Sequence, residues 1–231
     1  MAELTQAWRP GARVSRVRKS HSYGLVLILI ITSFVFASVA PQSAWGDSVL
    51  VLLQSGTLVL ALWTSGVARA DSPLSLTLLV STAIAALILV ISGGDTFRGL
   101  VGLLSGLILL ATLATIALGV FDQGKANLQA VTGAICVYIL LGMVFFFLYG
   151  GIAALGTQPF FAGGTDGTRP IRLYFSFVSL STVGYGDYTA GGNLGRMLAV
   201  SEAVLGQLYL VTVIAVLVSR IPGRSSTAAD T

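Results

Sequence analysis

Six long segments of this chain contain very few charged residues, and this feature limits most strongly how the chain can fold. They cover residues 23–40, 48–68, 74–92, 98–121, 128–151 and 195–219. The hydrocarbon core of a bilayer is about 30 Å thick, so a helix needs about 20 apolar residues to cross it. Only 10% of the residues are charged, against roughly 25% in soluble domains. The sequence therefore predicts an all-α integral membrane protein with six transmembrane helices.

The distribution of Lys and Arg predicts the orientation, because these residues are retained preferentially on the cytoplasmic side. With both termini inside, nine of the thirteen basic residues face the cytoplasm and four face outward. The inner set is Arg9, Arg13, Arg16, Arg18, Lys19, Arg69, Lys125, Arg220 and Arg224, and the outer set is Arg98, Arg169, Arg172 and Arg196. We expect a plasma-membrane protein with cytoplasmic termini and an outward-facing break at 152–194. The N-terminal basic run suits anionic lipid better than nucleic acid.

A secretory signal peptide is an alternative for the first segment. A basic stretch precedes an apolar core that ends near the small residues Ala37, Ser38 and Ala40, as such signals do. Pro41 would then begin the mature chain, and the apolar run is long for a signal. Cleavage would also leave five crossings, and the distribution of Lys and Arg would then no longer agree with the predicted orientation. We therefore favour a retained helix.

The sequence lacks the residue sets that disulfide bonds, metal clusters and catalysis require. Its single cysteine, Cys136, allows no intramolecular disulfide, and its single histidine, His21, leaves no Cys/His cluster for a metal. No set of nucleophile, base and orienting residue is evident. The aromatic run Phe145, Phe146, Phe147 and Tyr149 indicates an interfacial belt and packing rather than a cofactor site. We expect no enzyme activity and no cofactor.

The long break contains Thr182, Val183, Gly184, Tyr185, Gly186 and Asp187, in one-letter code TVGYGD. A ring of backbone carbonyls can replace the water shell of a cation if successive carbonyls turn toward one axis. Residues of such a strand alternate between ordinary conformations and conformations of positive φ, which glycine tolerates best. Gly184 and Gly186 have that spacing. Before them, Pro170 suits the first turn of a helix, and residues 171–181 predict a short apolar helix of about 18 Å. Its C-terminal dipole end would face a cation at the membrane centre.

This string resembles the selectivity filter of the potassium channel superfamily, and the resemblance covers residues 127–231. It implies an outer helix, a re-entrant pore helix and filter between the fifth and sixth crossings, and an inner helix. It also implies a homotetramer in which the carbonyls of Thr182, Val183, Gly184 and Tyr185 coordinate K+, with Gly186 completing the filter. The resemblance places Asp187 at the outer mouth and Gly206 at a gating hinge.

Two features depart from the family pattern. Val178 stands where some members have a pore-helix glutamate, next to the aromatic pair Tyr174 and Phe175. Glu202 is a carboxylate within the inner helix, one turn before Gly206, and charges at that depth usually face protein or water. We weigh two interpretations: a structural group bonded to Ser179 or Ser181, and a modulatory group that lines the ion path.

The predicted domain organisation is a basic N-terminus (1–22), a four-helix membrane domain (23–126), a pore domain (127–219) and a short cytoplasmic tail (220–231). Because the fourth segment contains only Arg98, we expect weak or absent voltage gating. The short tail predicts no soluble regulatory domain in this chain. The expected function is passive, potassium-selective conduction. Two alternatives stay open: a poorly selective cation channel on the same frame, and a non-conducting membrane subunit or sensor.

Overall fold

The computed structural model describes residues 22–40, 42–65, 95–121 and 128–219, with isolated positions between 77 and 88. The regular elements there are α2 (Ser22–Val39), α3 (Ala44–Thr64), α5 (Asp95–Phe121), α6 (Leu128–Leu155), α7 (Arg169–Leu180) and α8 (Asn193–Ser219). This part of the chain has no β-strand, only isolated bridges from Phe161 to Thr165 and Ala190. The prediction of an all-helical chain is confirmed for these residues.

Four of these helices, α3, α5, α6 and α8, are long and apolar enough to cross a bilayer. The apolar part of α2, Tyr23–Val39, is shorter. The predicted third crossing, 74–92, falls almost wholly outside the described residues, as do the basic N-terminus and the short tail. The protein is therefore a multi-pass membrane protein by its helices, and the count of six crossings stays a prediction.

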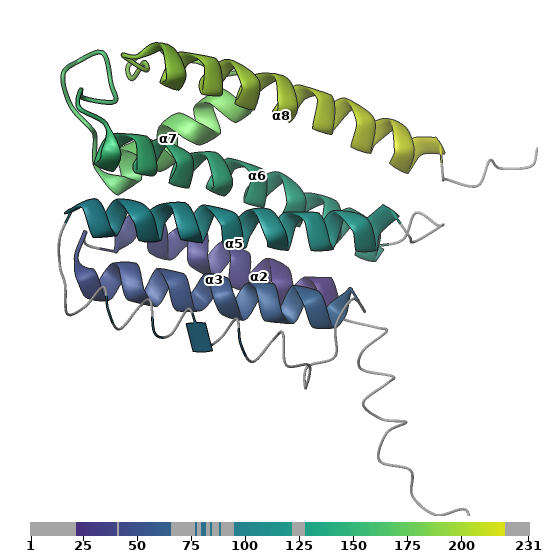
Figure 1. Ribbon diagram of the computed structural model, residues 1–231. Coiled ribbons are helices and arrows are strands. Elements are labelled where there is room, and N and C mark those ends of the chain that lie inside the picture. The colour runs from purple at the N-terminus through teal and green to yellow at the C-terminus, as the bar shows by residue number, and fades with distance from the viewer. Residues whose placement is uncertain are drawn as a thin grey trace, which may run out of the picture.

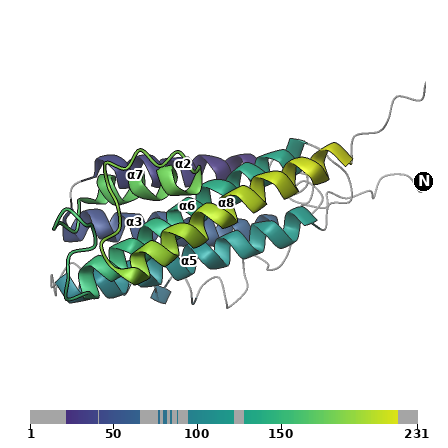
Figure 2. The same cartoon turned by 90° about the horizontal axis from the view of Figure 1, so that it is seen from above.

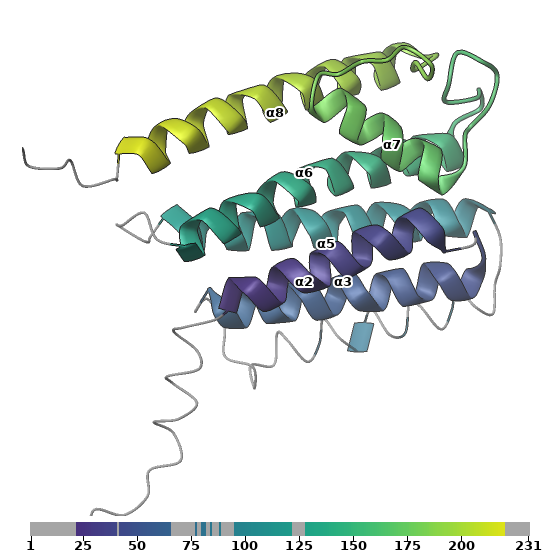
Figure 3. The same cartoon turned by 180° about the vertical axis from the view of Figure 1, so that it is seen from behind.

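The long helices lie side by side along a common direction (Figures 1 and 2). Helix α6 packs along α5, and α2 contacts α3, α6 and α7. Helix α8 is outermost and packs on α6 and α7 (Figure 1). The first turn of α2 and the last turn of α8 lie at the same end of the bundle, opposite the loop between α6 and α7 (Figure 3). This arrangement suits termini on one side of a membrane.

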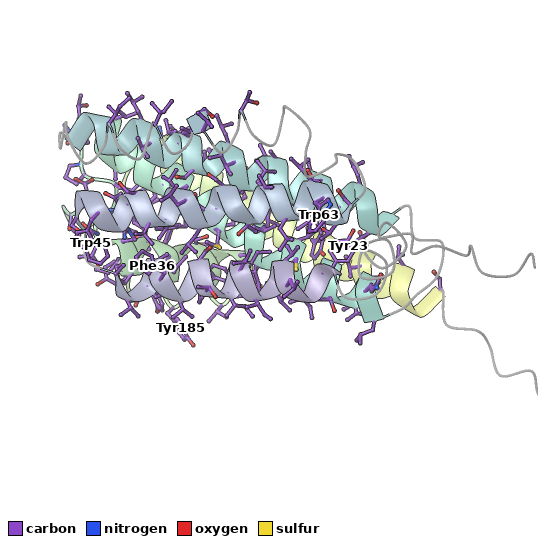
Figure 4. The ribbon with its side chains drawn as sticks, turned by 90° about the horizontal axis from the view of Figure 1, so that it is seen from below. Tyr23, Phe36, Trp45, Trp63 and Tyr185 are labelled. Atoms are coloured by element: carbon purple, nitrogen blue, oxygen red, sulfur yellow. The ribbon has the colours of Figure 1, made fainter. Side chains whose placement is uncertain are left out.

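Two tryptophans lie near opposite ends of α3 (Figure 4). Trp45 and Trp63 have 54% and 37% of their surface exposed. At 1.5 Å per residue they are about 27 Å apart along the helix axis, which is close to the thickness of a hydrocarbon core. Tryptophan is enriched at the two membrane interfaces, so this pair supports a transmembrane α3.

The aromatic run of α6 does not form an interfacial belt, and that part of the expectation is wrong. Phe145, Phe146, Phe147 and Tyr149 are all buried. They lie where α6 is covered by neighbouring helices and by the loop after it. Tyr149, for example, contacts the ring of Phe160 in that loop and the ring of Phe175 in α7. Their role is packing, the other half of the expectation.

Helix α7 has 12 residues, which gives a length of about 18 Å, too short to cross a bilayer. It begins with Pro170 in its first turn, as predicted, and its final residue Leu180 is fully buried. The chain after α7 returns to the end of the bundle at which α6 ended and α8 begins (Figures 1 and 3).

Candidate functional site

The residues after α7 are fixed to that helix through their backbone amides. The last turn of a helix leaves carbonyl groups without partners inside the helix. Here the amides of Thr182 and Val183 donate to the carbonyl oxygens of Ser179 and Val178, at 2.9 and 3.0 Å. The amide of Gly184 shares the Val178 carbonyl at 3.4 Å. The N–H groups of Thr182, Val183 and Gly184 therefore face the end of α7.

Every second residue of this segment has positive φ. The angles are 57° at Thr182, 55° at Gly184 and 81° at Gly186. Thr182 is the one described residue other than glycine with a positive φ, an uncommon conformation for a β-branched side chain. A strand in which every second residue has positive φ can turn successive carbonyls toward one side, which a ring of coordinating carbonyls requires. The two glycines thus have the conformation that the sequence predicted, and Thr182 shares it without a glycine to signal it.

The side chain of Tyr185 lies against α7. The ring of Tyr185 stacks on that of Tyr174 in α7, with centroids 6.4 Å apart and an interplanar angle of 4°. Figure 4 shows Tyr185 projecting at the edge of the molecule, where it is 72% exposed. Residues 181–187, which include Asp187, are exposed throughout. In a single chain, therefore, this segment lies at the surface.

Gln207 contacts residues 182–187, which we name the filter segment after its resemblance in sequence. Its Nε2 donates to the hydroxyl oxygen of Thr182 at 2.9 Å. Gln207 belongs to α8 and directly follows Gly206, so it brings a polar group from α8 to the inner end of the segment. No motif marks it, because its partner is 25 residues away.

Glu202 has different partners from those expected. It is fully buried, and its Oε1 and Oε2 lie 2.5 Å from the Ser176 hydroxyl and 2.6 Å from the Tyr149 hydroxyl. Ser179 and Ser181 do not bond to it, because Ser176 lies on the face of α7 that meets α6 and α8. The Ser176 hydroxyl also lies 2.7 Å from the carbonyl oxygen of Gly142. Glu202 thus joins α6, α7 and α8, as the structural interpretation requires, and is not exposed on α8.

Gly206 is placed where α8 comes closest to α7. A Cβ atom at this position would lie 2.3 Å from the carbonyl oxygen of Leu180, and α8 continues as one helix through it, from Asn193 to Ser219. Close packing is therefore a sufficient reason for glycine here. The hinge role stays a prediction.

Comparison with known proteins finds a similarity in the C-terminal part of the chain. Residues 133–222 match the family model described as an ion channel. The match begins in α6 and covers α7, the filter segment and α8. Neither a curated protein nor a solved structure matches the chain. The match supports an ion-channel family for this region, which contains the contacts of residues 182–187 and of Glu202 described above.

Proposed function

We propose that this chain is the subunit of a homotetrameric, potassium-selective channel that conducts K+ passively. The observation that carries the proposal is the alternation of positive φ at Thr182, Gly184 and Gly186, with the amides held by α7. That conformation would allow successive carbonyls to face one side, as coordination of a dehydrated cation requires. K+ would be held by the carbonyls of Thr182, Val183, Gly184 and Tyr185, with Asp187 at the outer mouth.

Exposure of α8 supports assembly from several copies. Only 11% of its apolar span is buried within one chain, against 61% for α6. Its exposed apolar side chains include Val200, Val204 and Leu208. One chain supplies one filter segment, so a closed ring of carbonyls needs further copies around a common axis. Four copies in the plasma membrane, with both termini cytoplasmic, form the proposed assembly.

Ion flux from liposomes tests the proposal. We expect the purified wild-type protein to release K+ and to retain Na+, and Gly184→Ala to abolish the K+ flux. Alanine at a φ of 55° costs about 1–2 kcal/mol, and relief of that strain would rotate a carbonyl away from the axis. Gly163→Ala is the matched control, because its new Cβ would meet nothing within 4 Å and its φ is ordinary.

The two alternatives predict other results in the same assay. A poorly selective channel would release Na+ as readily as K+, and its reversal potential would ignore the K+ gradient. A non-conducting subunit would release neither ion while still assembling as a tetramer. Either result from correctly assembled wild-type protein would contradict potassium-selective conduction.

A further inference from the structure

A cavity of about 370 Å³ lies where the N-terminal helices meet the start of α7. Its walls come from the beginning of α3 and α5, the end of α6 and the beginning of α7, which all lie at the filter end of the bundle (Figure 1). The volume is within the range of small-ligand sites, roughly 300–1,000 Å³. Part of the wall is made of small residues: Gly99, Gly102, Gly150, Ala153 and Ala154.

Two arginines of α7 line this cavity with buried N–H groups that have no partner among the described residues. These groups are Nη1 of Arg169 and Nε of Arg172. The side chain of Arg169 is only 7% exposed. A buried donor without an acceptor costs about 1–3 kcal/mol, and native proteins satisfy nearly all such groups. Two of them on one cavity indicate an acceptor that the chain itself does not supply.

Other atoms of the same guanidinium groups fix their positions. Arg169 donates through Nη2 to Asp47 of α3. Arg172 donates through Nη1 to the carbonyls of Asp166 and Gly167, at 3.0 and 2.7 Å. Both free N–H groups are therefore held in place before any ligand arrives, which lowers the entropy cost of binding.

Each of the two carboxylates at the cavity has a partner on one of its oxygens, whereas one N–H group on each arginine has none in the described part of the chain. Asp47 is paired with Arg169, and Asp166 accepts the amide of Phe160 at 2.9 Å. Among the described residues, Arg172 has no carboxylate within 4.0 Å. The unpaired groups are donors, so they favour an oxyanion, which would also meet the positive N-terminal end of α7.

We propose that this cavity binds a phosphate group, with one oxygen accepting from Arg169 Nη1 and another from Arg172 Nε. The phosphate belongs either to a lipid headgroup or to a free phosphate compound. The cavity lies at the end of the helices, where a bilayer would place its headgroups, and Phe146 and Phe147 give it an apolar side. The proposal does not depend on whether the protein conducts ions, because its test measures the binding of phosphate.

Thermal melting of the full-length protein tests the site. In detergent, inorganic phosphate is compared with chloride at equal ionic strength. In a second arm, nanodiscs of phosphatidylcholine with phosphatidylglycerol are compared with nanodiscs of a nonionic lipid that lacks phosphate. At about ten times the dissociation constant, occupancy should raise the melting temperature by roughly 3–5 °C. A shift with inorganic phosphate identifies a free-phosphate site, and a shift only in the phospholipid arm identifies a headgroup site.

Three variants separate the cavity from general effects. Gly102→Leu should fill the cavity and abolish the shift, since Gly102 lines the cavity and a Cβ there meets nothing within 4 Å. Gly56→Leu is the matched control in α3, also open at Cβ and outside the cavity, and should retain the full shift. Arg172→Gln should reduce the shift without filling the cavity. No shift in either arm for the wild type, or a shift in Gly102→Leu equal to that of the wild type, would overturn the proposal.

Discussion

At the scale of single residues, the hydrogen atoms around Glu202 can be counted. Ser176 has one hydroxyl hydrogen but lies within bonding distance of two oxygens, those of Glu202 and Gly142. The Tyr149 hydrogen goes to the other oxygen of Glu202. All contacts are satisfied at once if Glu202 carries a hydrogen and donates it to Ser176, which then donates to Gly142. A neutral carboxylic acid also avoids an unpaired charge in a buried site.

We therefore expect Glu202→Gln to be tolerated and Glu202→Ala to be destabilising. A glutamine amide donates to Ser176 and accepts from Tyr149, as the neutral acid does. Alanine leaves the Tyr149 hydroxyl without its acceptor, at a cost of about 1–3 kcal/mol, and opens a void, while Ser176 keeps its bond to Gly142. Melting temperature and K+ flux of both variants check this. If Glu202→Gln proved as unstable as Glu202→Ala, the charged form would be the native one.

The bond from Gln207 to Thr182 leads to a second residue-scale prediction. Thr182 lies at the inner end of the filter segment with a positive φ, and Gln207 orients its hydroxyl. We expect Gln207→Leu to lower K+ flux severalfold with little change in melting temperature, because an exposed hydrogen bond contributes only about 0.5–1.5 kcal/mol. Single-channel recording provides the measurement. Ser201→Ala is a control on the same helix, since Ser201 bonds only within α8, to Met197; unchanged conductance in Gln207→Leu would remove Gln207 from the ion path.

At the scale of elements, the contact of α8 with the end of α7 separates two explanations of Gly206. If close packing is the reason for glycine, Gly206→Ala must displace the Leu180 carbonyl, which a Cβ would approach to 2.3 Å. We expect a fall in melting temperature of several degrees, at about 2–4 °C per kcal/mol, together with a loss of flux. A pure hinge predicts unchanged melting and a lower open probability. Melting curves and single-channel records of this variant distinguish the two results.

The Arg169–Asp47 pair is the other contact between elements that matters for function. It joins the first turn of α3 to the first turn of α7. A displacement of α3 can therefore reach α7, the pore helix of the proposed channel, directly. Nothing in the local sequence of either residue indicates the other, because they are 122 positions apart.

At the scale of the whole molecule, the distribution of charge limits how the channel can be gated. Voltage sensors use three to four arginines per subunit, each contributing about 2.3 kcal/mol per 100 mV. The apolar span of α5, Gly99–Val120, contains no basic residue, and Arg98 precedes it. We expect a shallow conductance–voltage curve in symmetric K+. Steep activation over a few tens of millivolts would show that charges elsewhere in the chain move across the field.

The sequence by itself determined the membrane class, the boundaries of the described helices to within a few residues, and the segment 182–187. These properties depend on local composition, since 20 apolar residues form a helix in lipid whatever surrounds them, and positive φ selects glycine at Gly184 and Gly186. The TVGYGD string carries its own spacing, so the candidate site could be located before any fold was known.

Only the tertiary structure decided which polar groups meet. Glu202 bonds to Ser176 rather than Ser179 or Ser181, because the rotation of α7 against α8 determines which serine faces it. The pairing of Gln207 with Thr182 and the cavity beside Arg169 and Arg172 likewise depend on how separate helices dock. Periodicity shows that a side chain lies on a helix, but its partner is fixed by packing between distant segments, and that information is not local in the chain.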